Sequence, residues 1–362
     1  MSNFLNSRSR NERVTYSTGT GEQHELQSLT RVIRNHQAIW NAGNDYVVLE
    51  PVSSRQRSFN DQEGQGSAAY LPDLIHEIEC IFTDQSTGRK VYRGRLNGEE
   101  VAVKIFPINH PLRSQELEIW QSLPIHENLI RFVGMKFLLY KNQRVEPNVL
   151  TTPFYSAGSL QHYLVQNCLS IESLLLIATS IASGLDALHS QGVAHRDLTS
   201  SNILIENRNR KINCVINGFS KAFKNGFSKN DLLAISNIRY LPPEFLVEGA
   251  DQGSCTLNDF MMADVYAFGL ILWELLSRTA VQEYQVGTYM RPYSEIVPDD
   301  QLNIHRMRWS VVQQAQRPQV HEDWFKNKIT HEMVQIMTSC WLQEQNSRPT
   351  IRDITYILKS HT

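Results

Sequence analysis

Residues His195-Arg-Asp-Leu-Thr-Ser-Ser-Asn202 are the stretch that decides the fold of this 362-residue chain. They place a carboxylate, Asp197, and an amide, Asn202, five residues apart. A run with apolar residues at helical spacing precedes the stretch, and the strand-like run Ile203-Leu-Ile205 follows it. Chance rarely gives this order in this context. The stretch is therefore the first candidate for a loop that carries chemistry.

Composition restricts what the chain can be. It is 41% hydrophobic and 20% charged, which is typical of a globular protein, and its net charge of −2 favours neither a nucleic-acid nor an anionic membrane partner. The five cysteines form no CxxC pair, so a reducing compartment is expected. The first residues lack the apolar core of a signal peptide, and the most apolar runs, residues 174–188 and 268–276, are interrupted or shorter than the roughly 20 residues of a membrane span. We therefore expect a cytoplasmic protein with no transmembrane segment in this chain.

The chain divides into a polar segment and a folded domain. Residues 1–68 are rich in Ser, Gln, Asn, Arg and Gly and are expected to be a mostly disordered tail, with a short docking element within residues 31–50. Residues 69–362 are expected to form one domain of the α+β class, with strands first and helices afterwards. Strands are predicted at residues 91–96, 100–106, 131–141 and 148–154, with an Asn97-Gly98 turn between the first two, and helices at residues 114–122, 171–191, 258–278 and 332–343.

A second group of candidate functional residues consists of charged residues on the predicted strands and helices and in later segments. Lys104 ends the strand run Val101-Ala-Val-Lys104, and Glu116 lies twelve residues later on a predicted helix, with Glu118 as an alternative on another helix face. A lysine on a strand is by itself usually only solvated. Downstream, the segments Leu241-Pro-Pro-Glu244 and Ser347-Arg348-Pro349 each place one charged residue beside proline.

Taken together, these motifs resemble the receptor serine/threonine kinases that bind TGF-β and activin ligands. The resemblance is closer to the type II receptors of this family. The resemblance extends over about residues 72–360 and implies a two-lobed protein-kinase fold, with a small β-rich N-lobe (69–156) and a larger helical C-lobe (157–362). Its remaining motifs are Arg93 to Phe106, His126-Glu-Asn-Leu-Ile-Arg-Phe132, Gly158-Ser-Leu160, Val193 to Asp197, Tyr266 to Leu275, Met290-Arg-Pro-Tyr293 and Cys340-Trp341.

The resemblance assigns roles by position. Asp197 is implied as the catalytic base, and Lys104, paired with Glu116, as the contact to the ATP phosphates. Asn202 and Asn217 take the positions that hold Mg²⁺, and Glu244 and Arg348 take those of a buried structural ion pair. ATP, with magnesium, is therefore the expected cofactor. The residues implied to bind it are Lys104 at the phosphates and, around the adenine, Ala102, Thr152, Pro153, Tyr155 and Leu204.

Several positions depart from the family pattern. Asn217 replaces the aspartate that binds Mg²⁺, and a neutral amide is a weaker ligand for this cation. Gly218 and Phe219 stand in inverted order, which is expected to misplace the metal ligand. Thr199 replaces a lysine. The phosphate-binding loop has Asp84, Ser86 and Arg89 in place of its three glycines. In the implied peptide-docking segment, residues 235–240, Asn237 replaces a threonine.

These losses lead to a functional hypothesis with two alternatives. The favoured one is a pseudokinase, a scaffold or regulator in signalling of the TGF-β-receptor type. Its partners would be other proteins, either receptor kinases or their substrates, and it would be recruited to membrane receptors from the cytoplasm. The first alternative is an active or weakly active serine/threonine protein kinase. The second is a nucleotide-gated scaffold that binds ATP without transferring its phosphate.

Overall fold

The computed structural model describes most of the domain and a short segment before it. The described residues are 46–51, 76–83, 90–96, 98–105, 119, 122–123, 125–131, 133–140, 143–208, 211–224, 237–247, 255–281 and 286–361. The predicted helix at residues 114–122 and the phosphate-binding loop lie largely or wholly outside them.

The N-lobe is an antiparallel sheet with strand order β1-β5-β6-β4-β3-β2. Its strands are β1 (Tyr46–Pro51), β2 (His76–Thr83), β3 (Lys90–Leu96), β4 (Glu99–Ile105), β5 (Gly134–Tyr140) and β6 (Gln143–Pro153). The pairing of Leu96 with Glu99 confirms the hairpin predicted at Asn97-Gly98, where Gly98 has the φ of +81° that such a turn requires.

β1 lies inside the segment expected to be mostly disordered, near the end of residues 31–50, where a docking element was predicted. It pairs antiparallel with β5, from Tyr46 opposite Leu139 to Pro51 opposite Gly134. The sheet therefore receives a strand from well before residue 69. The rest of residues 1–68 lies outside the described residues.

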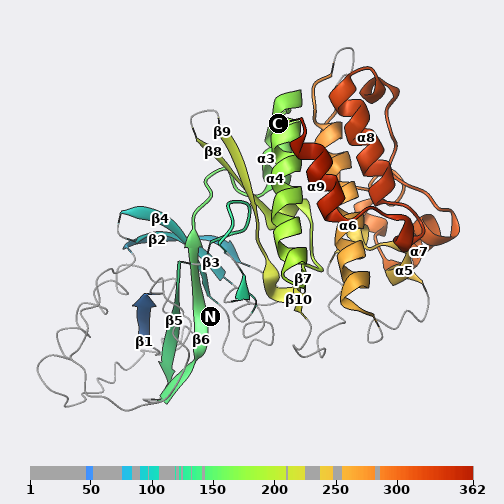
Figure 1. Cartoon of the computed structure of the whole chain (residues 1–362). Coiled ribbons are helices and arrows are strands. Elements are labelled where there is room, and N and C mark those ends of the chain that lie inside the picture. Colours follow the sequence, from blue (N-terminus) through green and yellow to red (C-terminus); the bar gives the residue numbers. More distant parts are fainter. Residues whose placement is uncertain are drawn as a thin grey trace, which may run out of the picture.

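The C-lobe is mainly helical, and Figure 1 shows its helices on the opposite side of the hairpin β8–β9 from the N-lobe sheet. Its α-helices are α3 (Leu160–Gln166), α4 (Ile171–Ser190), α5 (Pro243–Leu246), α6 (Leu257–Ser277), α7 (Ile304–Arg308), α8 (Lys328–Cys340) and α9 (Ile351–Lys359). Its strands are β7 (Val193–Ala194), β8 (Ile203–Arg208), β9 (Lys211–Ile216) and β10 (Phe223–Lys224). Short 3-10 or π segments are η2 (Ser200–Asn202), η3 (Phe219–Lys221), η4 (Ile238–Tyr240), η6 (Asp299–Gln301), η7 (Trp309–Gln313), η8 (Glu322–Phe325) and η9 (Gln345–Ser347). This architecture confirms the expected two-lobed α+β fold.

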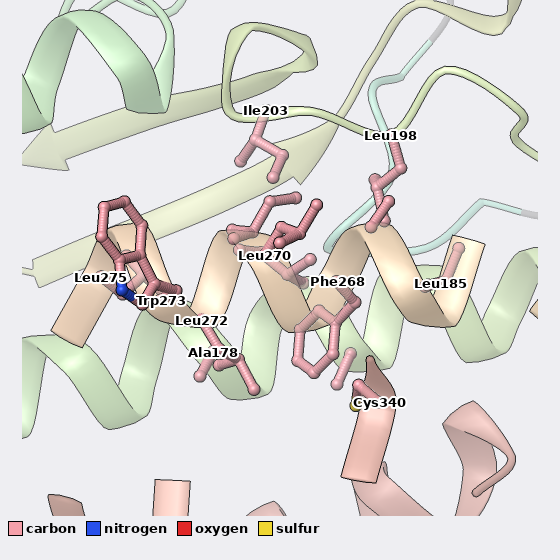
Figure 2. Close-up of a cluster of buried hydrophobic side chains, with 14 of the residues drawn as sticks. Ala178, Leu185, Leu198, Ile203, Phe268, Leu270, Leu272, Trp273, Leu275 and Cys340 are labelled. Carbon is pink, nitrogen blue, oxygen red and sulfur yellow. The ribbon is translucent and has the colours of Figure 1, made fainter. Parts of the chain in front are cut away.

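Helix α6 forms the centre of the C-lobe core. Sixteen of its residues are buried, which is why its sequence is apolar on all sides. Figure 2 shows Leu198 and Ile203, beside the candidate catalytic loop, pointing toward α6 from one side, while Ala178 of α4 and Cys340 of α8 lie on the other. The loop therefore rests on the most buried helix of the lobe.

Two predictions about helices need correction. The helix predicted at residues 332–343 begins earlier, at Lys328, because Asn327 caps it by accepting hydrogen bonds from Ile329 N and Thr330 N, and it ends at Cys340. The second correction concerns helices α4 and α6, which are longer than the apolar runs at residues 174–188 and 268–276 that were judged too short or too interrupted to span a membrane. By length and composition both could cross a membrane, but 50% and 89% of their apolar windows are buried inside the protein, so they are weak evidence for a span.

Candidate active site

A buried carboxylate of α6, that of Asp264, holds the start of the candidate catalytic loop through hydrogen bonds. Asp264 accepts hydrogen bonds from the backbone N–H of His195 (2.7 Å) and of Arg196 (2.8 Å), and lies 3.0 Å from His189 Nε2. Arg196 has a φ of +62°, a conformation that non-glycine residues rarely adopt. The two hydrogen bonds to one buried carboxylate stabilise this turn, which leads directly into Asp197.

The ring of His195 links the two halves of the site. Its Nδ1 accepts a hydrogen bond from the Asp197 N–H (3.2 Å), and its Nε2 lies 3.0 Å from the carbonyl oxygen of Asn217. A backbone N–H can only donate and a carbonyl can only accept, so the ring is neutral with its proton on Nε2. This fully buried histidine therefore fixes the distance between the loop and the segment that follows β9.

Three side chains orient the carboxylate of Asp197. Asn237 donates to Oδ1 at 2.8 Å, and Lys221 Nζ lies 3.4 Å from the same oxygen. Asn202 donates to Oδ2 at 3.1 Å and to the Asp197 carbonyl at 2.7 Å. The structure thus brings together Asp197 and Asn202, as the sequence predicted, and adds two residues to them.

Lys221 is the contact that sequence reasoning missed. The expected lysine two residues after Asp197 is replaced by Thr199, which is buried and whose hydroxyl has no hydrogen-bond partner in the described part of the chain. The cation beside Asp197 comes instead from η3, after β9. No spacing rule links residues 197 and 221, so only the folded chain shows that a cation is present.

Asn217 reaches the lysine of the N-lobe. Lys104 is only 6% exposed, and its Nζ donates to Asn217 Oδ1 at 3.0 Å. The position implied to carry a metal-binding carboxylate is therefore occupied by an amide of nearly the same shape, but without the charge.

The inverted Gly218-Phe219 order is accommodated by a left-handed turn directly after Asn217. Gly218 has a φ of +90°, and a Cβ there would lie 2.6 Å from Asn202 Oδ1, so any other residue would strain the backbone and displace the Asn202 side chain. The left-handed turn brings the next residue back: Phe219 is fully buried, with its ring 5.4 Å from the ring of His195 and edge-on to it. An aromatic contact to His195 is thus made one residue later.

The oxygen donors available here fit a divalent cation poorly. Asn202 and Asn217 contribute amide oxygens, whereas Mg²⁺ prefers charged oxygen ligands. Asn217 Oδ1 already accepts from the Lys104 ammonium group, which would repel a cation at short range. Both predicted metal ligands are in place, but the donor set lacks the charge that binding requires.

The residues predicted for the adenine side fall on adjoining elements. Ala102 of β4 is paired with the buried Thr152 of β6, and Pro153 with Val101. The Tyr155 N–H donates to none of the described residues, which leaves it available to an adenine nitrogen. Leu204 bridges to Ser159 and so lies close to this linker. Glu116, predicted to pair with Lys104, lies outside the described residues.

A buried acid behind the loop was not predicted. Glu274 of α6 is fully buried and accepts hydrogen bonds from Ser200 Oγ (2.7 Å), Tyr240 OH (2.8 Å) and Tyr289 OH. Burial raises the pKa of Glu274 to about 7, although the three donors oppose this shift. The cluster joins the catalytic loop to η4, which forms the end of the predicted peptide-docking segment at residues 235–240.

The ion pair predicted between Glu244 and Arg348 is confirmed. Arg348 donates to both carboxylate oxygens, at 2.7 and 2.8 Å, and its guanidinium also lies 5.1 Å from the ring centre of Tyr266. This bidentate contact ties α5 to the segment before α9.

Comparison with known proteins agrees with this geometry. Residues 84–358 match the family described as protein tyrosine and serine/threonine kinase. Among curated proteins, the activin receptor type-2A of Xenopus laevis is 35% identical over 71% of this chain and 51% of its own length. The activin receptor type-1 of Gallus gallus is 33% identical over 79% of this chain and 59% of its own length. The TGF-beta receptor type-1 of Rattus norvegicus is 31% identical over 80% and 60%.

The chain thus spans between half and three-fifths of the length of these relatives. The match covers both lobes and every described residue of the site. By its fold, its catalytic loop and this match, the chain belongs to the protein tyrosine and serine/threonine kinase family, with activin and TGF-beta receptors among its relatives.

Proposed function

We propose that this chain is a pseudokinase that acts as a scaffold or regulator in signalling of the activin and TGF-β receptor type. The observation that carries the proposal is the hydrogen bond from Lys104 Nζ to Asn217 Oδ1 at 3.0 Å. Kinase domains in general use ATP with Mg²⁺. Here the side chain at the metal position is neutral and already accepts from a cation.

The size of the loss supports impaired catalysis. A single electrostatic stabiliser of phosphoryl transfer contributes several kcal/mol, or roughly 10³-fold in rate. The sequence lacks a second one as well, since Asp84, Ser86 and Arg89 replace the glycines whose backbone N–H groups would approach the phosphates. Even if the two losses do not add fully, turnover would be negligible for an ordinary kinase.

The proposed partners follow from the relatives and not from the site. Proteins named as activin and TGF-beta receptors are similar to this chain over most of its length. A kinase fold without transfer activity can still bind such receptor kinases or their substrates. We place the protein in the cytoplasm, recruited to receptors at the membrane.

One set of contacts favours the rival function, an active or weakly active serine/threonine kinase. His195, Asp197 and Phe219 are assembled, and Lys221 supplies a cation 3.4 Å from Asp197 Oδ1. These contacts would orient a substrate hydroxyl if the phosphates of ATP were positioned by other means.

A nucleotide-gated scaffold is the third candidate, supported by the adenine side of the cleft. The adenine side does not depend on the metal position: it consists of Ala102, Thr152 and the Tyr155 N–H, which donates to none of the residues that the structure describes. Inhibitors that bind through the adenine site alone should therefore bind more readily than Mg-ATP.

Thermal-shift titration with ATP, with and without Mg²⁺ or Mn²⁺, separates the three functions. No shift supports the scaffold, a metal-independent shift the nucleotide-gated scaffold, and a metal-dependent shift the enzyme. Incubation with labelled ATP should show little phosphate incorporated into the protein or a generic substrate. Robust incorporation that is abolished by Asp197→Asn would refute the pseudokinase function.

A further inference from the structure

Asn217 is followed directly by a glycine, and this dipeptide has a chemistry of its own. The backbone nitrogen of a residue after asparagine can attack the side-chain amide carbon. Glycine permits the attack most readily, because it has no Cβ to obstruct the approach. Modification here would replace the amide at the metal position by a carboxylate.

Two contacts in the structure favour the attack at Asn217. Lys104 Nζ donates to Asn217 Oδ1 at 3.0 Å, and this oxygen takes up negative charge when the amide carbon is attacked. The Gly218 N–H makes no hydrogen bond within the described part of the chain, so the attacking nitrogen need not break one. The nucleophile is free and the developing charge faces a cation.

Two other contacts oppose the attack by holding the asparagine main chain. Asn217 N donates to the carbonyl oxygen of Asn202 at 2.8 Å, and Asn217 O accepts from His195 Nε2 at 3.0 Å. Neither contact involves the amide carbon or the glycine nitrogen, between which the new bond forms.

We propose that Asn217 is a self-modification site, at which the native protein converts its own asparagine to aspartate and so completes the ligand set for a divalent cation. The inference rests on the proposed function and deepens it. The impaired metal position, with Asn217 unmodified, would be one state of the site, and the aspartate form would be the other. Lys104 acts in this reaction as the cation beside the oxyanion.

The reaction needs only water. Gly218 N is buried, so it passes its proton to a water molecule that enters beside the partly exposed Asn217. It forms a bond to Asn217 Cγ, and the electron pair of the C=O moves onto Oδ1 beside Lys104. The pair returns, the bond from Cγ to Nδ2 breaks, and ammonia leaves with a proton from solvent. Water then opens the cyclic imide at Cγ and gives an aspartate at position 217. Opening at the main-chain carbonyl would give an isoaspartyl residue instead.

The chain contains its own control for the intrinsic rate. The five residues Asn217-Gly-Phe-Ser-Lys221 recur as Asn225-Gly-Phe-Ser-Lys229. In an unfolded chain the two asparagines have nearly the same neighbours and should react at the same rate. Any difference between them in the native protein therefore reports the effect of the fold.

The test is peptide mapping by mass spectrometry of the full chain, aged at neutral pH in the native state and in urea. The mass increase that accompanies exchange of an amide for an acid is followed separately at positions 217 and 225. We expect equal rates in urea. In the native protein we expect Asn217 to convert faster than it does in urea, with aspartate as its product.

The role of Lys104 is tested with Lys104→Met and a matched control, Lys224→Met, which removes a nearby cation that does not contact Asn217. Thermal melts establish that both variants are folded. We expect about tenfold slower conversion at position 217 in Lys104→Met, an unchanged rate at 225 and no effect of the control.

The native and urea rates of the unaltered chain decide the question even if Lys104→Met fails to fold. Native conversion at 217 that is slower than in urea, or that yields isoaspartate alone, would overturn the inference. This readout is independent of ATP binding. A stable Asn217 in a protein that transfers no phosphate would remove the inference and leave the proposed function standing.

Discussion

The catalytic loop is held from two sides that differ in charge. On the α6 side, the carboxylate of Asp264 accepts from two backbone N–H groups, and Arg348 and Glu244 form a bidentate pair nearby in the same lobe. On the β9 side, the loop contacts the Asn217 carbonyl oxygen through His195 and the Lys221 cation through Asp197. The side chain at the position implied to bind Mg²⁺ is the neutral amide of Asn217. The side that holds the fold keeps its charges, whereas the side that would hold a cation has lost one. Stability and phosphoryl transfer can therefore be separated in this protein.

The largest effect should come from the charged side. Asp264→Ala leaves the N–H groups of His195 and Arg196 buried without an acceptor, and His189 without its partner, so we expect the free energy of unfolding to fall by about 4 kcal/mol. Urea unfolding measures this loss. The exposed Asp300→Ala is the control and should change stability by less than about 0.5 kcal/mol. Equal losses in the two variants would mean that Asp264 does not hold the loop.

The second effect depends on pH and concerns Glu274, whose pKa is raised from 4.5 to about 7 in the folded protein. The folded state then binds a proton more tightly than the unfolded state. The stabilisation is complete below the unfolded pKa and is lost as the pH rises through about 7. Relative to Glu274→Gln, the protein should lose about 3 kcal/mol between about pH 4.5 and about pH 8. A difference between the two proteins that stays constant with pH would show that Glu274 titrates normally.

A smaller loss of stability is expected when a glycine with positive φ is replaced, and it should differ between Gly218 and Gly98. In Gly218→Ala the new Cβ would meet Asn202 Oδ1, and moving that side chain would strain its hydrogen bonds to Asp197. Gly98 has a similar φ but nothing within 4 Å of a new Cβ. We expect Gly218→Ala to cost about 2 kcal/mol of unfolding free energy and Gly98→Ala about 1 kcal/mol. Thermal melts with equal shifts would mean that the contact with Asn202 is loose.

The smallest expected effect restores the missing charge. Asn217→Asp should tighten ATP binding in the presence of Mg²⁺ by about tenfold, or about 1.4 kcal/mol, because it adds a charged oxygen to the donor set. Phosphoryl transfer should stay far below that of an ordinary kinase, since the loop at residues 84–89 still lacks its glycines at positions 84, 86 and 89. Calorimetry measures the binding, with Asn225→Asp as a control of equal charge. A large gain in transfer activity would mean that the loop matters less than its sequence indicates.

The sequence predicted the parts of the molecule that depend on strong local patterns. The β3–β4 hairpin follows from Asn97-Gly98, and helices α4 and α6 follow from their apolar spacing. The pair between Glu244 and Arg348 was implied by the resemblance to a known family, since nothing local connects residues so far apart.

The parts that could not be predicted depend on where side chains meet in space. Lys221 approaches Asp197 only because η3 folds back toward the loop. The contact of Phe219 with His195 depends on the left-handed conformation of Gly218, which the residue type permits but does not require. Glu274 looks like one more residue of an apolar helix until Tyr240 and Tyr289 are placed beside it.

The pairing of β1 with β5 has a consequence for solubility. β5, with the sequence Gly-Met-Lys-Phe-Leu-Leu-Tyr, would be an edge strand of the sheet without β1, and its free N–H and C=O groups could pair with another molecule. Residues 46–51 lie in a segment of polar composition, yet they cover this edge. A fragment that begins at residue 69 would contain the whole catalytic loop and the C-lobe. It would aggregate more readily than the full chain, because it lacks β1.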